Sequence, residues 1–398
     1  MLLNLAVGLM VFIGMMAFVV DYGVMWVGRG QAQNAADAGA LAGAVALALD
    51  TNGWTDRTVT GPARTAAHQM AQSNLIWSQA PSVNVATDVF FTGLPLAMCP
   101  PDVNGLTPCI RVDVYRNQTR GNPLPVIFGR AVGLIDQGVR ATATARVAVA
   151  NASDCLKPWA IPDKWLEQYP APAPWTSAST FETGVQQGQT WTPYNPPDVY
   201  TPPSGSNPGT GFTVAADLGL QVTLKAGGPQ TSIAPGVYFP VRIPTYTGNS
   251  TGGSDYQANI SGCNGIPISI DTVLQSENGN MIGPTAQGVA DLIALDPQAR
   301  WDSATKSVVN SCAQATTACA PRSPRIVAIP IFDTALFEST KRQGIPEFKV
   351  VNILGFFIDD MQGNDVVGYL TEVPGLTVGA APAVNPQAAF LWNIQLIQ

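Results

Sequence analysis

The stretch Leu2–Val20, LLNLAVGLMVFIGMMAFVV, decides how this chain is organised. It contains no charged residue, and its one polar side chain is that of Asn4. Because an α-helix rises ~1.5 Å per residue, ~20 such residues cross a hydrocarbon core ~30 Å thick. Asp21 follows the stretch and Trp26 suits the headgroup region, where aromatic side chains gather. The sequence therefore predicts a transmembrane anchor over residues 1–27.

A removable signal peptide is the competing interpretation of this stretch. It would have a basic start, an apolar region of about 7–15 residues and a small-residue cleavage site. The segment has no basic start and is longer, which favours a retained anchor. A soluble adhesin released by cleavage near residue 45 is a further alternative. Since no positive residue precedes the span, the positive-inside rule cannot orient it, and we expect the natural reading frame to begin upstream with basic residues.

Cysteine usage indicates an oxidising compartment. The six cysteines are Cys99, Cys109, Cys155, Cys263, Cys312 and Cys319. An even number in an exported chain fits disulfides, whereas a metal site needs tighter clusters and more histidine than the single His68. Short loops favour Cys99–Cys109 and Cys312–Cys319, which leaves Cys155–Cys263 by elimination. We therefore expect a single-pass protein of the inner (cytoplasmic) membrane with the bulk of its chain extracytoplasmic.

The helix is predicted to continue beyond the span, from Trp26 to Leu49. Residues three or four apart share one polar face of a helix, and these are Arg29, Gln33, Asn34 and Asp37. A column of small residues is formed by Ala35, Gly39 and Gly43. Small residues let two helices approach closely. The column can pack on a sheet of the same chain or against other helices in an assembly, and the sequence leaves both open.

Two segments, Val20–Gly23 and Gly30–Ala44, closely resemble the N-terminal module of TadG-like and TadE-like proteins of the tight-adherence (Flp pilus) system. In that family an apolar span ends in Asp-aromatic-Gly and is followed by a helix of the type Q-x-A-A-D-A-A-A-L-A. The resemblance implies a single-pass envelope protein associated with pilus assembly or the cell surface. The matching residues are Asp21, Gln33, Asn34, Ala35, Ala36, Asp37, Gly39 and Gly43. The Asp-x-Ser-x-Ser metal motif of some longer members is missing, so no metal site is carried over.

The rest of the chain predicts an α+β protein. Residues 28–150 would form a membrane-proximal domain in which the long helix packs on a small antiparallel sheet. A second helix is expected at 63–77, a short helix at 126–135 and alternating strands at 83–91, 110–115 and 140–149. Residues 151–210 are rich in Pro, Gly and Ser and predict a linker. Residues 211–398 predict a mostly-β domain with one helix, whose expected strands are 219–225, 236–243, 266–270, 325–332, 348–358 and 365–370.

Composition and motifs disfavour two broad functions. A net charge of −7 without a Lys/Arg run argues against nucleic-acid binding. With one histidine, a Ser-His-Asp triad or a zinc centre lacks its residues. The segment Gly248–Gly252 matches G-x-S-x-G, but we expect a loop rather than a helix after it. Carboxylate pairs remain, either Asp359 with Asp360 or Asp271 with Glu277, and a carbohydrate-active enzyme is therefore the alternative function.

The leading hypothesis is a non-enzymatic, membrane-anchored envelope protein that acts in Flp/Tad-type pilus assembly or in surface adhesion. Its expected partners are membrane lipid and other pilus-assembly or envelope proteins. No cofactor and no catalytic residue is expected.

Overall fold

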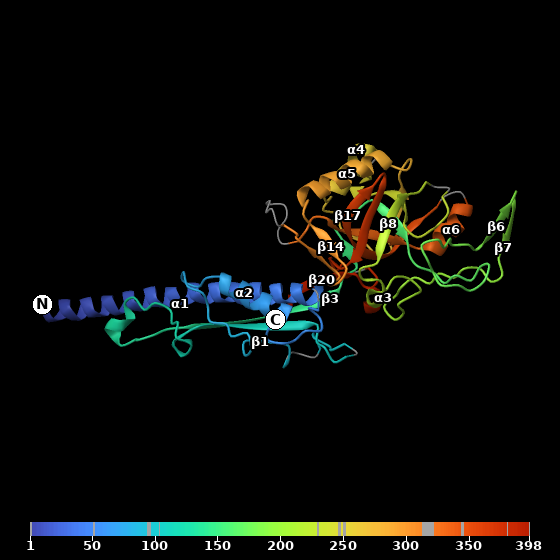
Figure 1. Ribbon diagram of the computed structural model, residues 1–398. Coiled ribbons are helices and arrows are strands. Elements are labelled where there is room, and N and C mark those ends of the chain that lie inside the picture. Colours follow the sequence, from blue (N-terminus) through green and yellow to red (C-terminus); the bar gives the residue numbers. More distant parts are fainter. Residues whose placement is uncertain are drawn as a thin grey trace. The chain divides into compact units, whose positions relative to one another are not determined.

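The computed structural model describes residues 2–397 except 51, 94–96, 103, 229–230, 246–247, 250–251, 313–321, 344–345 and 380 (Figure 1). The chain forms two compact units. Unit 1 comprises Met1–Ala148 and Ile394–Gln398, and unit 2 comprises Val149–Asn393. A long N-terminal helix followed by a mostly-β region agrees with the α+β class that the sequence predicts.

Unit 1 is built on one continuous helix, α1 (Leu2–Leu49). From Val7 onward it is long and apolar enough to cross a membrane. Among the described residues, no other helix has both the length and the apolar composition to do so. Its first part exposes large apolar side chains such as Leu9, Phe12 and Phe18. Its second part is completely buried at alanines that recur on one face, namely Ala32, Ala35, Ala36, Ala40 and Ala44. The helix thus changes from an exposed apolar rod to a core element without a break.

The core of unit 1 lies between α1, the helix α2 (Pro62–Ser73) and a small sheet. The sheet runs β1 (Val89–Phe90), β2 (Cys109–Arg116) and β3 (Val139–Val149) in antiparallel order. The last residues of β20 (Leu391–Ile397) belong to this unit too. Two 3₁₀ turns, η1 (Gln118–Arg120) and η2 (Gly129–Val132), complete it. On β2 the side chains that alternate inward are fully buried, and these are Ile110, Val112 and Val114.

The strand expected at 83–91 is mostly a turn. Asn84 Oδ1 accepts from the backbone N–H of Ala86 at 2.9 Å, and Asp88 Oδ2 accepts from that of Asn84 at 2.7 Å. Short polar side chains that bond their own backbone compete with a strand ladder. Only Val89–Phe90 therefore pair as β1. For 126–135 the structure has the four-residue η2 rather than a longer helix.

Unit 2 is organised around a seven-stranded sheet in the order β13-β17-β16-β5-β9-β8-β18. Strand β18, the last in this order, also pairs with β17. The six strands from β17 to β18 therefore close into a barrel. The strands of the whole sheet are β5 (Trp159–Pro162), β8 (Gln221–Ala226), β9 (Val237–Arg242), β13 (Val273–Ser276), β16 (Ile326–Phe332), β17 (Phe348–Gln362) and β18 (Asp365–Thr371). A buried cluster of aromatic rings joins Phe239, Phe332 and Phe348 of these strands to Phe337 of the helix at 334–342.

Smaller elements surround the barrel. The helices are α3 (Val214–Asp217), α4 (Gly253–Ser261), α5 (Ile282–Leu295), α6 (Thr334–Arg342) and η3 (Pro386–Ala388). The short strands are β4 (Ala152–Ser153), β6 (Gly184–Gln187), β7 (Thr190–Pro193), β10 (Pro244–Thr245), β11 (Gly248–Asn249), β12 (Ile268–Ser269), β14 (Arg300–Asp302), β15 (Ser307–Val309) and β19 (Val373–Pro374). As the apolar run at 348–358 predicts, β17 is buried and central, and Gly363 at φ +63° turns the chain into β18.

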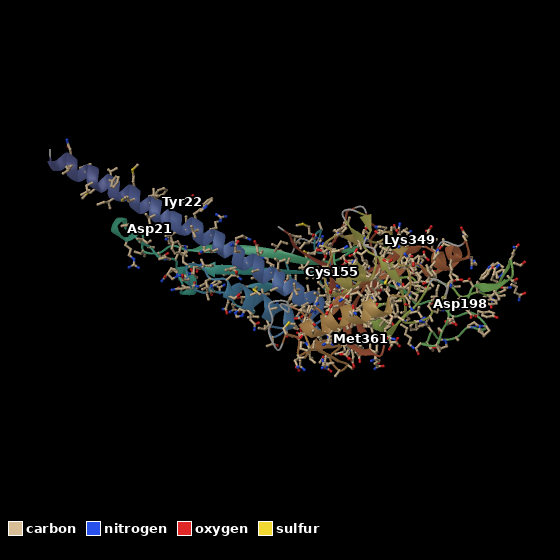
Figure 2. The ribbon with its side chains drawn as sticks, turned by 90° about the horizontal axis from the view of Figure 1, so that it is seen from above. Asp21, Tyr22, Cys155, Asp198, Lys349 and Met361 are labelled. Atoms are coloured by element: carbon tan, nitrogen blue, oxygen red, sulfur yellow. A yellow bond between two sulfur atoms is a disulfide. The ribbon has the colours of Figure 1, made fainter. Side chains whose placement is uncertain are left out.

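The interpretation of 151–210 as a linker is wrong, because this segment belongs to unit 2. Trp159 and Ala160 are completely buried in β5, inside the barrel sheet. The buried Asp198 (Figure 2) accepts hydrogen bonds from three backbone N–H groups, at 2.7 Å from Gln168, 3.0 Å from Tyr169 and 2.7 Å from Glu182. Here a carboxylate accepts hydrogen bonds from backbone N–H groups that would otherwise pair with another strand. Because these groups are not paired between strands, the segment shows no strand periodicity.

Two of the expected disulfides are in place. Cys99 and Cys109 are bonded in unit 1 with their Cα atoms 5.7 Å apart. Cys155 and Cys263 are bonded in unit 2 with a Cα separation of 4.5 Å (Figure 2 labels Cys155). The third pair stays a prediction, because Cys319 lies outside the described residues.

Lys157, two residues after Cys155, is buried beside the end of α4. Its Nζ donates to the carbonyl oxygens of Asn259 at 3.3 Å and Gly262 at 2.6 Å. Burial lowers the pKa of Lys157 to about 7. Because the carbonyls at a helix C-terminus carry partial negative charge, they favour the protonated amine. Lys157 thereby fastens α4 to the strand region that carries the Cys155–Cys263 bridge.

Candidate functional site

The apolar part of α1 meets the folded part of unit 1 at Asp21 (Figure 2). The Asp21 side chain is only 3% exposed, although it lies in an otherwise apolar stretch of helix. Its carboxylate accepts from the backbone N–H of Ile127 at 2.6 Å and of Phe128 at 3.1 Å, and a third, short hydrogen bond comes from Gly129. A buried carboxylate is costly unless such donors surround it. Asp21 therefore holds a distant loop against α1.

That loop, residues 124–137, is here called the Asp21 loop. Its two ends are joined by the N–H of Leu124, which donates to the Gln137 carbonyl at 2.9 Å, and by Gln137 Nε2, which donates to the Pro125 carbonyl at 2.5 Å. A Cβ on Gly129 would lie 2.8 Å from Asp21 Oδ2 and 3.0 Å from Leu134 Cβ, so a larger residue there would force the carboxylate or the loop to shift. The loop is a closed, internally bonded unit rather than a loose connection.

A groove runs between α1 and the Asp21 loop. Its cavity volume is about 490 Å³. It is lined by Gly14, Phe18, Asp21, Tyr22, Met25, Gly129, Leu134 and Gln137. Because Gly14 and Phe18 precede Asp21 in α1, the groove extends beside the apolar part of the helix.

A second contact holds the next turns of α1. Trp77 Nε1 donates to the Val24 carbonyl at 3.0 Å, and the Trp77 backbone N–H donates to Gln31 Oε1 at 2.9 Å. Gly28 lies so close to Leu124 that a Cβ would come within 2.9 Å of its Cδ1 atom. The segment after α2 and the start of the Asp21 loop are thus both packed on α1 within about three turns of Asp21.

The polar residues of the family motif divide between two roles. Gln33 Nε2 donates to Asp37 Oδ1 at 2.8 Å, one turn further along α1, and to the Thr142 carbonyl of β3 at 3.2 Å. Asn34 faces outward and is exposed. Ala35 and Ala36 are completely buried. Gln33 therefore ties α1 to the sheet and is itself held by Asp37, whereas Asn34 is exposed at the surface.

The small-residue column of α1 packs within its own chain. A Cβ on Gly39 would lie 2.9 Å from Ala71 Cβ and 3.4 Å from Val112 Cγ1. A Cβ on Gly43 would lie 2.9 Å from Ala67 Cβ and 2.7 Å from Ile110 Cδ1. The hypothesis that Gly39 and Gly43 pack on helices of other molecules is therefore wrong. The expected packing on the chain's own sheet is only part of the contact, because α2 covers most of this column.

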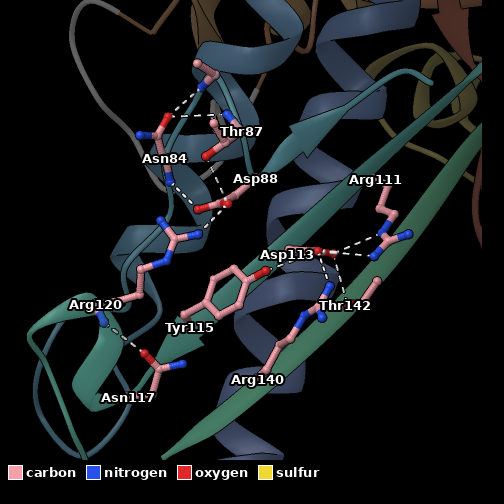
Figure 3. Close-up of polar contacts among 11 residues, drawn as sticks. Asn84, Thr87, Asp88, Arg111, Asp113, Tyr115, Asn117, Arg120, Arg140 and Thr142 are labelled. Atoms are coloured by element: carbon pink, nitrogen blue, oxygen red, sulfur yellow. Dashed lines mark hydrogen bonds and ion pairs between the residues drawn. The ribbon is translucent and has the colours of Figure 1, made fainter. Parts of the chain in front are cut away.

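The outer face of the sheet carries a charged network that the sequence analysis missed (Figure 3). Asp113 is bonded by Arg111 at 2.9 Å, Arg140 at 2.5 Å and Thr142 at 2.9 Å, which joins β2 to β3. Burial alone would raise the pKa of Asp113, but the hydrogen bonds from these donors hold it below its usual range. Arg140 also lies over the ring of Tyr115, 5.3 Å from its centroid. The network is a structural clamp on the sheet.

A second acid on the same side, Asp88, pairs with Arg120 at 2.8 Å (Figure 3). The guanidinium of Arg120 lies 4.5 Å from the centroid of the Tyr115 ring. Alternation places Asp113 and Tyr115 on the outward face of β2, and apart from Arg111 of the same strand their partners come from β3 and η1. Spacing alone could not have identified those partners.

The carboxylates considered for catalysis have basic or backbone partners. Asp271 pairs with Lys349 at 2.9 Å, and the two line a cavity of about 310 Å³ in unit 2 (Figure 2 labels Lys349). Glu277 is buried beside Arg242 at 3.5 Å. Asp359 accepts from the Trp301 backbone N–H at 3.3 Å.

The G-x-S-x-G segment lies in unit 2, whereas the histidine lies in unit 1. Ser250 lies outside the described residues, and α4 begins at Gly253, so the expectation of a loop after this segment is wrong. The single histidine, His68, lies in α2 of unit 1. Among the described residues, no group of three or more His, Cys, Asp and Glu side chains could hold a metal ion.

The N-terminal part of the chain matches a known protein family, and the match ends at residue 46. Residues 4–46 match the family model described as "Putative Flp pilus-assembly TadE/G-like". No curated protein and no solved structure matches the chain. The matched range runs from the apolar part of α1 through Asp21 and Gln33 to Gly43. The N-terminal module of this chain, residues 4–46, thus matches the TadE/G-like Flp pilus-assembly family.

Proposed function

We propose that this chain is a non-enzymatic scaffold of the bacterial envelope that acts in Flp/Tad-type pilus assembly or surface adhesion. The apolar part of α1 would cross the inner membrane, and the bulk of the chain would lie on the extracytoplasmic side. The family match over residues 4–46 and the presence of a helix able to span a bilayer support this proposal. Disulfides in both units fit an oxidising compartment.

One observation carries the proposal, namely that four of the matched residues hold α1 against the rest of unit 1. Asp21 binds the Asp21 loop, Gln33 binds β3, and Gly39 and Gly43 admit α2. A helix fixed at four successive places cannot swing at the membrane surface. These contacts hold unit 1 at a fixed distance from the membrane and in a fixed orientation. An assembly scaffold requires such a fixed geometry, which a flexible tether would not provide.

The acidic composition also fits this role. The net charge of −7 and the charged fraction of 12% leave a surface rich in neutral polar side chains. Binding would then rest on shape and hydrogen bonds more than on long-range attraction. We infer that the partners are other pilus-assembly or envelope proteins and membrane lipid.

Deleting the gene in its own bacterium should abolish Flp-type pili or reduce attachment to surfaces, as counted by electron microscopy and an adherence assay. Wild-type protein should restore both. A variant with Asp271→Asn and Glu277→Gln should restore them equally well, because the proposed role uses no carboxylate chemistry. Unchanged pili and adherence in the deletion strain would contradict the proposal, and failure of the carboxylate variant alone, with normal protein levels, would favour the enzyme alternative.

A further inference from the structure

The tip of the Asp21 loop exposes four large apolar side chains. Ile127 is 52% exposed, Phe128 45%, Leu134 41% and Ile135 80%. They lie on either side of η2, in a loop whose two ends are closed by hydrogen bonds. Large apolar side chains that are exposed together on a short loop indicate a site for an apolar partner.

The position of the tip identifies this partner. Leu134 lines the same groove as Gly14 and Phe18, which precede Asp21 by two turns and one turn of α1. At ~1.5 Å per residue, Gly14 lies roughly 10 Å further toward the N-terminus than Asp21. The tip therefore runs alongside the part of α1 whose own large apolar side chains are exposed. Its apolar surface continues that of the span.

Polar and aromatic groups near Asp21 mark the boundary of this apolar zone. Tyr22 and Trp26 are exposed on α1, and Arg130 is exposed on the loop. Tyrosine and tryptophan favour the headgroup region of a bilayer, and arginine can reach lipid phosphates from a partly inserted position. These groups lie at the level where an outer leaflet would meet water.

We propose that Ile127, Phe128, Leu134 and Ile135 enter the hydrocarbon of the outer leaflet, so that unit 1 has a second membrane contact beside α1. This inference rests on the proposed function, because it requires α1 to span the bilayer. Polar backbone at membrane depth must be satisfied internally. The Asp21 carboxylate satisfies three of the loop's groups in this way, the N–H groups of residues 127–129. Asp21 thus lowers the cost of inserting this part of the loop.

The second contact has a mechanical consequence. A single helix leaves a protein free to tilt and rotate in the bilayer, whereas a second contact beside the helix restrains both motions. With the loop inserted, α2 and the sheet of unit 1 would keep one orientation relative to the membrane. A partner in an assembly would then meet the same face on every copy.

Photocrosslinking of the full-length protein in phosphatidylcholine/phosphatidylglycerol liposomes tests this inference. The photoreactive residue p-benzoylphenylalanine would replace Ile135 or, in a second variant, Ile127. Phe12 of α1 is the matched position for the span, and Val59, exposed in unit 1 near the start of α2, is the matched position for water. Lipid adducts would be measured by mass spectrometry of the intact protein after irradiation.

We expect adducts at Ile135 and Ile127 of the same order as at Phe12 and about tenfold above Val59, because acyl chains are confined to the bilayer core. Adducts at Phe12 with background levels at both loop positions would overturn the inference and leave the anchor standing. Crosslinks from the loop to a second copy would overturn it too. Background levels at Phe12 would instead refute the anchor itself, and with it the proposed function.

Discussion

Replacing Asp21 with alanine should release the Asp21 loop from α1 while both units remain folded. The change leaves the backbone N–H groups of Ile127, Phe128 and Gly129 without their acceptor. A hydrogen bond to a charged group contributes about 1.5–3 kcal/mol, and three that share one carboxylate are not additive, so we expect a local loss of about 3–5 kcal/mol. Hydrogen exchange of these three amides, measured in detergent by mass spectrometry, should accelerate at least about 100-fold.

Two variants make this result specific. Asp21→Asn keeps one side-chain oxygen as an acceptor and should fall between wild type and alanine. Asp136→Ala removes an acid from the same loop, where it is half-buried and further along the chain, and should leave exchange at residues 127–129 unchanged. If Asp21→Ala exchanged no faster than Asp136→Ala, the family aspartate would have no part in holding the loop.

Replacing Gly43 with valine should destabilise unit 1 by about 3 kcal/mol, the upper part of the usual cost of overpacking. The new Cβ alone would stand 2.7 Å from Ile110 Cδ1, 2.9 Å from Ala67 Cβ and 3.1 Å from the Ala63 carbonyl oxygen. Either α2 or β2 must then move away from α1. Denaturant unfolding followed by circular dichroism, together with hydrogen exchange of α2, measures the loss.

The same substitution at Gly30 serves as the control. Gly30 is exposed on α1, and a Cβ there would meet nothing within 4 Å. Since glycine is among the poorest helix formers, Gly30→Val should leave stability unchanged or raise it by about 0.5 kcal/mol. Equal effects at Gly30 and Gly43 would mean that the column is not a packing surface.

The sequence alone is sufficient to predict the parts of the fold that depend on local periodicity. The uncharged run before Asp21 predicts the start of α1, and the alternating apolar residues at 110–115 and 140–149 predict the paired strands β2 and β3. The apolar run at 348–358 with its glycine turn predicts the β17–β18 hairpin. These patterns report which face of an element is buried, and burial is what the local sequence encodes best.

Partners that are distant in the chain could not be predicted in the same way. Asp21 is bonded to residues more than one hundred positions away, and backbone N–H groups leave no side-chain signal in the sequence. The misinterpretation of 151–210 has a related cause. Asp198 gathers three backbone donors of that segment, so a Pro- and Gly-rich stretch folds without a strand or helix period.

One signal for the packing of Gly39 and Gly43 was present. Helix α2 carries its own column of small residues at the same spacing of four, namely Ala63, Ala67 and Ala71, and all three are completely buried. Two small-residue columns of equal spacing in consecutive helices form a matched pair. Comparing the two helices would have favoured packing within the chain over lateral assembly.

The central claim is that the apolar part of α1 crosses the membrane and leaves both units on the extracytoplasmic side. Protease added to washed, intact spheroplasts tests this claim in one measurement, read with antibodies to unit 2 and to a cytosolic protein. The account predicts that unit 2 stays with the washed spheroplasts and is digested while the cytosolic protein is protected. Full-length chain that resists the protease until the spheroplasts are lysed would contradict it.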